Sequence, residues 1–469
     1  MKQNFDLMNL LPNSLLFIII SLIPFKEAAR TSILSKRWMN LWKHSTNIEF
    51  NEHYFSRSCE TGYSQRIIQR MDFVKFILLW IENNKDNFFI EKFALKLLDF
   101  DREFDRKIIE TCVAFATQKD VKDLVLDFSN PNWVVEDFEK IEALYELPTK
   151  VYDHKSLRSL KLISCSFVET ELIKLSALKQ VYFAWMELKS DAIELLLSNC
   201  KMIESLTMKK CWISTKFECC GSYMSLKRII VDRCKFVYAG LAINAPNLNY
   251  FEYYGKVIYF QMKNSLHMEE ADLNLGHEYE FPENDGLIYN MVADFKHVKV
   301  LTICSYTLQV LCNELGPMLK EDEMNTRHLK LKTNLHNDEC QGVTFLLNSC
   351  PFLEHLTIDL GFGRFFDSAS KKYYSSKVNG DKPRSWIEYL NIFPSLTSTL
   401  KMVEINNFRG TENEVLLLHF VINNGSLLQR ININLQKDEV EMGENYGNVK
   451  EFVMNIPRAS RDLEISFSY

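Results

Sequence analysis

A short hydrophobic unit recurs along most of this chain of 469 residues. Each copy has apolar residues at its first, fourth and sixth positions, and Cys or Asn often follows three residues later. The clearest copies are residues 157–165, 203–211 and 226–234. Alternating apolar residues place one side of a short strand on a core. Because no single copy buries its own apolar face, such a chain folds only by stacking its copies.

Weaker copies extend the pattern toward both ends of the chain. They begin at Ile90, Val121, Leu178, Leu248, Glu270, Val298, Thr326, Leu353, Leu400 and Leu428. In the middle of the chain their spacing matches the period of about 20–29 residues that leucine-rich repeats have. Residues 191–199 and 340–348 have the apolar spacing of helices that return the chain to the next strand. The sequence therefore predicts an α/β fold, an irregular leucine-rich-repeat solenoid of parallel strands and helices.

The Cys or Asn after each strand predicts an inward turn at a corner of the solenoid. There its side chain can hydrogen-bond backbone groups of the neighbouring coil. The positions that fit this role are Cys165, Cys211, Cys234 and Asn334. The chain has twelve cysteines, spread without the dense framework of small secreted domains. We therefore expect reduced thiols with structural roles.

Residues 7–46 differ from the repeats and are typical of three short helices. Pro12 suits the first position of a helix, Pro24 ends that helix, and Ser35 is a good N-cap for the third. Residues 1–46 carry six Lys or Arg against two acids, a net charge of +4, whereas the whole chain has −6. So many large apolar groups cannot all be buried within forty residues. Some of them are expected to face a partner or the next domain.

The stretch 6–42 resembles an F-box. The match is carried by Leu-Pro at 11–12, an apolar helix, Pro-Phe at 24–25, and Ser-Lys-Arg-Trp at 35–38 before Trp42; it departs from the plant-type pattern at Leu7, Asn9 and Met39. The resemblance implies docking onto a Skp-type adaptor of a cullin–RING ubiquitin ligase. The adaptor-binding residues that it implies are Leu11, Pro12, Leu15, Leu16, Ile19, Phe25, Ser35, Arg37, Trp38, Leu41 and Trp42. We expect about half of such apolar positions to pack in the F-box's own core.

Residues 400–435 are similar to the FBD region at the end of many plant F-box proteins. Within them, Thr411 and Glu414 have the spacing of a capping box, which predicts a helix over 412–423, and Gly425 is placed to end it. The patterns together divide the chain into an F-box (7–46), a helical linker or cap (47–84), the repeat solenoid (85–385) and FBD-like repeats (386–460).

The sequence carries no motif for catalysis or cofactor binding. Phosphate-binding glycine loops, H-E-x-x-H and C-x-x-C are absent, and His336, Cys340 and Cys350 lack a convincing spacing and a fourth ligand for a metal. The charge of −6 gives no basis for nucleic-acid binding. The apolar run 15–23 is too short for a membrane, which needs about 20 residues. We expect no enzyme, no cofactor, no metal and neither a nucleic-acid nor a membrane partner.

Aromatic residues expected outside the strand frame are candidates for target binding, because aromatic side chains frequently anchor interfaces. They are Trp185, Trp212, Tyr238, Tyr253, Tyr254 and Tyr259. Packing between coils is the alternative role for them.

The sequence as a whole predicts a non-catalytic receptor of the cytoplasm or nucleus. The F-box would bind the Skp-type adaptor and, through it, the cullin scaffold, while the repeats would hold an unidentified protein for ubiquitination. One alternative is a leucine-rich-repeat scaffold without a ligase role. Another is a secreted recognition protein, with the run 15–23 as the core of a signal peptide.

Overall fold

The structure is a computed structural model with two compact units. The first comprises Met1–Thr215 and Tyr223–Leu226, and the second Lys216–Ser222 and Lys227–Tyr469. The residues that the structure describes are 10–55, 63–85, 89–98, 102–130, 132–133, 144–167, 173–220, 225–238, 240–263, 267–276, 286–311, 323–362, 393–436 and 443–468. Leu7, Asn9 and the expected boundary at 385/386 lie outside these ranges.

The first unit opens with the helical head that the sequence predicts for 7–46. Its helices are α1 (Asn13–Leu22), α2 (Phe25–Arg30), and the 3₁₀ helices η2 (Thr31–Ile33) and η3 (Trp38–His44). Two details differ from the expectation. Pro12 is the cap before α1 and not its first residue. Ser35 does not cap η3, whose cap residue is Arg37; the Ser35 carbonyl, and not its hydroxyl, accepts from the Trp38 N–H at 3.0 Å.

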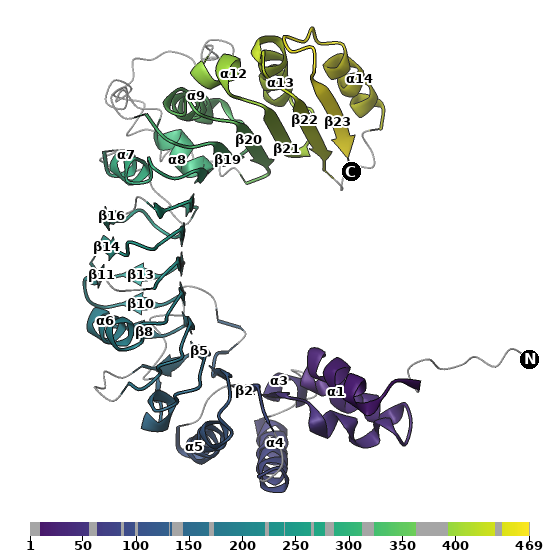
Figure 1. Ribbon diagram of the computed structural model, residues 1–469, viewed down its shortest axis with the longest axis vertical. Helices are drawn as coiled ribbons and strands as arrows, with labels where there is room; N and C mark the ends of the chain where they lie inside the picture. Colours follow the sequence, from purple (N-terminus) through teal and green to yellow (C-terminus); the bar gives the residue numbers. More distant parts are fainter. Residues whose placement is uncertain are drawn as a thin grey trace, which may run out of the picture. The chain divides into compact units, whose positions relative to one another are not determined.

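Parallel strands follow the head in the first unit (Figure 1). Their order is β1 (Asn47–Asn51), β2 (Lys92–Lys96), β3 (Asp123–Asp127), β5 (Ser159–Ile163), β7 (Gln180–Ala184) and β9 (Ser205–Lys209). Between them lie α3 (Glu52–Phe55), α4 (Tyr63–Asn83), α5 (Arg102–Gln118), η5 (Thr149–Tyr152), α6 (Ser190–Asn199) and the short strands β4 (Tyr145–Glu146), β6 (Cys165–Ser166), β8 (Glu187–Leu188) and β10 (Trp212–Ile213). The range 47–84, expected to be helical, thus also holds β1, the first strand of the sheet.

The second unit continues with parallel strands of the same kind. They are β12 (Arg228–Asp232), β15 (Tyr250–Tyr254), β17 (Glu270–Asn274), β18 (Val300–Cys304), β19 (His328–Thr333), β20 (His355–Leu360), β21 (Met402–Phe408), β22 (Arg430–Leu435) and β23 (Glu464–Ser468). A smaller parallel sheet holds β11 (Phe217–Cys220), β14 (Gly240–Asn244) and β16 (Tyr259–Lys263), and β13 (Lys235–Phe236) is a two-residue strand. The remaining elements are α7 (Gly286–Ala293), α8 (Ser305–Val310), η8 (Asn337–Glu339), α9 (Cys340–Ser349), α12 (Pro394–Ser398), α13 (Glu412–Asn424) and α14 (Gly443–Met454). Figure 1 shows α9, α13 and α14 on one side of β19–β23.

Each predicted copy of the hydrophobic unit holds one of these strands, so the α/β class and the parallel solenoid are confirmed. In most copies the strand begins two residues after the first apolar position. Leu157, Leu178 and Leu226, for example, precede their strands and are fully buried. The first apolar residue therefore packs the turn that leads into the strand, and the next two point from the strand into the core.

The corner after the strand is a sharp turn in consecutive coils. Ser164, Trp185, Lys210 and Arg233 have positive φ angles of 58°, 51°, 49° and 52°. This left-handed conformation costs a residue with a Cβ roughly 1–2 kcal/mol. Its recurrence at the same position shows that stacking of the coils, and not local preference, imposes it.

The residues at the corners act partly as the sequence predicts. The Cys165 thiol donates to the Leu126 carbonyl of the preceding coil at 3.8 Å, and the Asn334 side chain accepts from the Gly361 N–H of the next coil at 3.1 Å. The thiols of Cys211 and Cys234 donate to the carbonyls two residues before them.

The capping box predicted at Thr411 and Glu414 is present at the start of α13. The Glu414 carboxylate is fully buried and accepts from the backbone N–H groups of Arg409 and Gly410, both at 2.8 Å. Gly425 ends the helix as expected.

Candidate functional site

A compact core holds the helical head together. Leu16, Ile20, Ala28, Trp38 and Leu41 are buried in one cluster, against which Leu11, Ile19 and Trp42 are packed and partly buried. Leu16, Trp38 and Leu41 belong to the adaptor-binding set that the sequence suggests. Their side chains shape the head from inside and present no surface of their own.

Phe25 joins the head to the first strand and to α4. Its ring is buried and makes edge contacts with Trp42, Phe50 and Trp80, at centroid separations of 5.7, 5.9 and 6.1 Å. Such aromatic pairs contribute about 0.5–1.5 kcal/mol beyond the area they bury. Phe25, also in the predicted set, therefore fixes the head on the beginning of the repeats.

Arg37 ties the last helix of the head to the start of α1. Its guanidinium donates to the Leu11 carbonyl and to the Asn13 side-chain oxygen, the latter from Nη2 at 2.8 Å and from Nε at 3.2 Å. These bonds hold the Leu11–Pro12 segment in place. Arg37 thus contributes to the candidate site by positioning Leu11 and Pro12.

The opposite side of α1 is an apolar surface open to solvent. Leu15, Ile18 and Leu22 recur at helical spacing on that side, with exposed fractions of 45%, 58% and 79%. Ile33 and Leu34 follow α2 and are 85% and 65% exposed. We call the exposed residues Pro12, Leu15, Ile18 and Leu22 the α1 face. A helix that is apolar on every side is normally buried on every side, so this surface is suited to a protein partner.

Sequence reasoning identified only part of the α1 face. Pro12 and Leu15 are in the predicted set, but Ile18 and Leu22 are not. What separates these exposed residues from the buried ones is the rotational position of each residue around the helix. Leu16 and Ile20, four residues apart, form the buried stripe of α1, and Ile18 and Leu22 therefore point to the other side.

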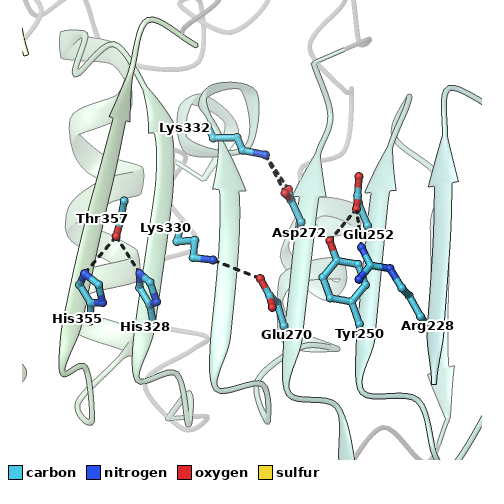
Figure 2. A network of polar contacts seen from close by, with 10 residues as sticks. All are labelled: Arg228, Tyr250, Glu252, Glu270, Asp272, His328, Lys330, Lys332, His355 and Thr357. Carbon is cyan, nitrogen blue, oxygen red and sulfur yellow. Dashed lines mark hydrogen bonds and ion pairs between the residues drawn. The ribbon is translucent and has the colours of Figure 1, made fainter. Parts of the chain in front are cut away.

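The second unit presents a polar surface along its parallel strands (Figure 2). The Tyr250 hydroxyl donates to Glu252 at 2.7 Å, and the Arg228 guanidinium lies 3.7 Å from the centre of the Tyr250 ring. Lys330 and Lys332 on β19 donate to Glu270 and Asp272 on β17, at 3.3 and 2.8 Å.

These two ion pairs pass over the intervening strand β18, whose outward residue between them, Thr302, is only 3% exposed. Burial raises the pKa of Asp272, although the hydrogen bond from Lys332 opposes that rise. These ion pairs therefore cover β18, and the surface above this strand is polar and carries charges of both signs.

Two imidazoles are stacked on the same surface. The rings of His328 and His355 lie 3.9 Å apart and nearly parallel, and the Thr357 hydroxyl lies 2.9 Å from one Nε2 and 3.4 Å from the other. Burial, with His355 and Lys330 nearby, lowers the pKa of His328 to about 4, and burial also lowers that of His355. Both rings are therefore neutral at pH 7. Among the described residues, no three His, Cys, Asp or Glu side chains are grouped to hold a metal ion.

The aromatic candidates for target binding fall into different environments. Trp212, Tyr238 and Tyr259 are exposed, and Trp185 and Tyr254 are partly buried. The Trp185 ring lies 5.5 Å from that of Trp133 and 4.4 Å from the Lys210 ammonium.

The structure corrects the placement of four of these residues outside the strands. Tyr253 and Tyr254 lie in β15, Trp212 in β10 and Tyr259 in β16. Strand alternation turns Tyr253 inward and its neighbour Tyr254 outward. Tyr253 is fully buried, its hydroxyl donates to the Lys256 carbonyl at 2.6 Å, and so it offers no surface to a target.

A helical head with an unburied apolar face, followed by one parallel strand per coil, defines a leucine-rich-repeat protein with an F-box. The F-box domain family matches residues 8–49, and the family described as At1g61320/AtMIF1, LRR domain, matches residues 83–460. The second match covers most of the chain. This chain belongs to the F-box/LRR proteins. No helix within the described ranges has the length and apolar character needed to cross a membrane.

Relatives from Arabidopsis thaliana agree over nearly the whole length. F-box protein At3g62230 is 31% identical over 437 residues, which cover 91% of each chain. F-box/LRR-repeat protein 13 is 26% identical over 486 residues, with 98% of this chain and 96% of the relative covered. The FBD-associated F-box protein At1g66310 is 26% identical over 477 residues, which cover 97% and 94%. A leucine-rich-repeat protein of Leptospira interrogans has a TM-score of 0.27 over 83% of this chain and 98% of its own, which is too low to carry an argument.

Proposed function

We propose that this chain is the target-binding subunit of an SCF-type cullin–RING ubiquitin ligase, acting in the cytoplasm or nucleus. Its F-box docks on a Skp-type adaptor, which links it to the cullin, and its repeats hold a protein target. The observation that carries the proposal is the α1 face, an exposed apolar surface on a head that matches the F-box family.

The α1 face supplies the binding energy in this proposal. Fully burying a leucine or isoleucine side chain contributes about 1.5–3 kcal/mol, and Ile18 and Leu22 are more than half exposed. Leu16, Trp38 and Leu41 act indirectly, since they hold α1 in place, and Phe25 fixes the head on the start of the repeats. The partly buried Leu11, Ile19 and Trp42 pack against the buried core of the head, and Arg37 holds the Leu11–Asn13 segment.

Charge favours an acidic adaptor surface. The side chains of Lys26, Lys36 and Lys43 are exposed on the head, which carries the excess of basic residues in an otherwise acidic chain. Such steering raises association rates more than it raises affinity, and salt weakens it.

The repeats have the character of a recognition surface. The outward side chains of β12, β15, β17, β19 and β20 form a polar layer with charges of both signs (Figure 2). Trp212, Tyr238 and Tyr259 offer exposed aromatic rings, with the partly buried Trp185 and Tyr254 beside the corners. A bound target would be held near a ubiquitin-conjugating enzyme on the cullin. Its lysines would then react at a high effective concentration, so this chain needs no catalytic group.

The test is binding of the purified full chain to a purified Skp-type adaptor, measured by calorimetry. We expect Ile18→Asp and Leu22→Asp to weaken binding at least about a hundredfold, since each would place a charge in a desolvated interface. Leu427→Asp is the matched control, because Leu427 is an exposed leucine of the second unit. A folded wild-type chain that does not bind the adaptor would overturn the proposal and leave a scaffold or a secreted recognition protein as the alternative.

A further inference from the structure

A second exposed apolar surface lies on α4, outside the head. One side of this helix is buried through Phe73, Ile77 and Trp80. The other side exposes Ile68 and Leu79, at 59% and 63%, as well as Ile67, Met71 and Leu78. These exposed residues lie between the F-box match, which ends at residue 49, and the repeat match, which begins at residue 83. Neither match accounts for this surface.

The exposed residues follow the spacing of a coiled-coil seam. Ile68, Met71, Lys75 and Leu78 are separated by three, four and three residues, as at successive a and d positions. At a rise of about 1.5 Å per residue the seam is about 15 Å long. We call these four residues the α4 seam. Such a stripe is suited to packing against one further helix.

The charges on this side of α4 indicate which helix that is. Lys75 sits in the middle of the seam, with Asp72 one turn before it on the flank. Both side chains are exposed. Among the residues that the structure describes, the hydrogen bonds and ion pairs involve neither Asp72 nor Lys75. A partner helix must therefore pack against the aliphatic part of the Lys75 side chain and place a carboxylate beside its ammonium group.

A second α4 helix, running antiparallel, meets both requirements. If the two-fold axis crosses the helix pair at the height of residue 73, Ile68 faces Leu78 of the second copy and Met71 faces its Lys75. Lys75 then lies beside Asp72 of the second copy, and the same pair repeats across the axis. A parallel arrangement would instead place Lys75 against Lys75, which is unfavourable in a seam. A single lysine at such a position is known to specify register and oligomer state, and charge pairs on the flanks of a seam set the orientation of the helices.

We propose that this chain self-associates through the α4 seam as an antiparallel two-fold dimer. The dimer is weak, with a Kd of about micromolar order, because one short seam buries less than the roughly 800 Å² per partner of a standard interface. It would present two F-boxes and two repeat surfaces in one assembly, which raises avidity for a target that is itself multivalent. The proposal goes beyond adaptor binding and does not depend on it.

The test is sedimentation velocity of the full chain from about 0.1 to 100 µM, a range that brackets the expected Kd. We expect a concentration-dependent dimer for wild type and a monomer throughout for Leu78→Asp. Asp72→Lys, which turns two attractive pairs into two repulsive ones, should weaken the dimer at least about tenfold. The double variant Asp72→Lys/Lys75→Asp should restore it, because the pairs re-form with reversed sign.

Leu427→Asp again serves as the matched control, and it should dimerise like wild type. Far-ultraviolet circular dichroism and adaptor binding of every variant separate a folding defect from loss of the seam. A wild-type chain that stays monomeric over the whole range would overturn the proposal. So would a double charge reversal that fails to rescue Asp72→Lys, or a Leu78→Asp chain that loses adaptor binding, since the seam would then belong to the adaptor interface.

Discussion

Leu15 and Leu16 are adjacent leucines of α1 that the structure gives opposite roles. Leu16 is fully buried in the core of the head, whereas Leu15 is 45% exposed on the α1 face. Truncating a fully buried leucine costs about 2–5 kcal/mol, because a cavity remains. We therefore expect Leu16→Ala to destabilise the head by about 3 kcal/mol. Leu15→Ala should lower its stability by less than about 1 kcal/mol, as is usual for partly exposed positions.

For adaptor binding we expect the opposite order, with the larger direct effect from Leu15→Ala. About half of the Leu15 side chain remains to be buried by a partner, which corresponds to about 1 kcal/mol, or about a fivefold change in Kd. Hydrogen exchange of the α1 amides reports the local stability of the head, and calorimetry with the adaptor reports the affinity. Equal loss of α1 protection in the two variants would refute the burial argument. Unchanged affinity in Leu15→Ala would remove Leu15 from the proposed interface.

Three further predictions concern single positions. Arg37→Lys should weaken adaptor binding several-fold in calorimetry, because an ammonium cannot hold Leu11 and Asn13 together as the guanidinium does; wild-type affinity would contradict the positioning role. The His328 pKa is about 4, below the value of about 6.5 in an unfolded chain, so this residue's contribution to stability should be complete above pH 6.5 and decline as pH falls toward 4. Urea unfolding at several pH values should show this decrease in the free energy of unfolding for wild type and a smaller decrease for His328→Gln. Equal decreases in the two proteins would contradict the prediction. Glu414→Ala should destabilise α13 by about 1–3 kcal/mol, since two partly buried N–H groups lose their acceptor. Hydrogen exchange of the Arg409 and Gly410 amides measures this effect, and unchanged protection would contradict it.

Local patterns were sufficient to predict the repeats. Every copy of the hydrophobic unit became a strand, and α6, α9 and α13 fall within a residue or two of the expected ranges, because each depends on periodicity within about ten residues. The same reasoning missed β1, whose five residues lie in a range dominated by helical spacing, and β23 at the end of the second unit.

The candidate site was only half predictable. The F-box pattern named an apolar set in the correct segment, but it did not separate Leu16, which is buried, from Leu15, which faces solvent. That distinction requires the packing of α1 against Trp38 and Leu41. Likewise, nothing near Tyr253 in the sequence says that its ring packs 4.9 Å from that of Phe260.

The sequence by itself thus determined the class of fold, the succession of the repeat strands from β2 to β22 and the family, because these follow from short-range spacing and from motifs. Only the tertiary structure decided which apolar side chains remain exposed on α1 and α4, and which charges meet across strands. Lys330 and Glu270 are 60 residues apart in the chain and form an ion pair over β18. The physical reason is that burial and charge pairing depend on neighbours that stacking brings together, and a linear pattern does not contain those neighbours.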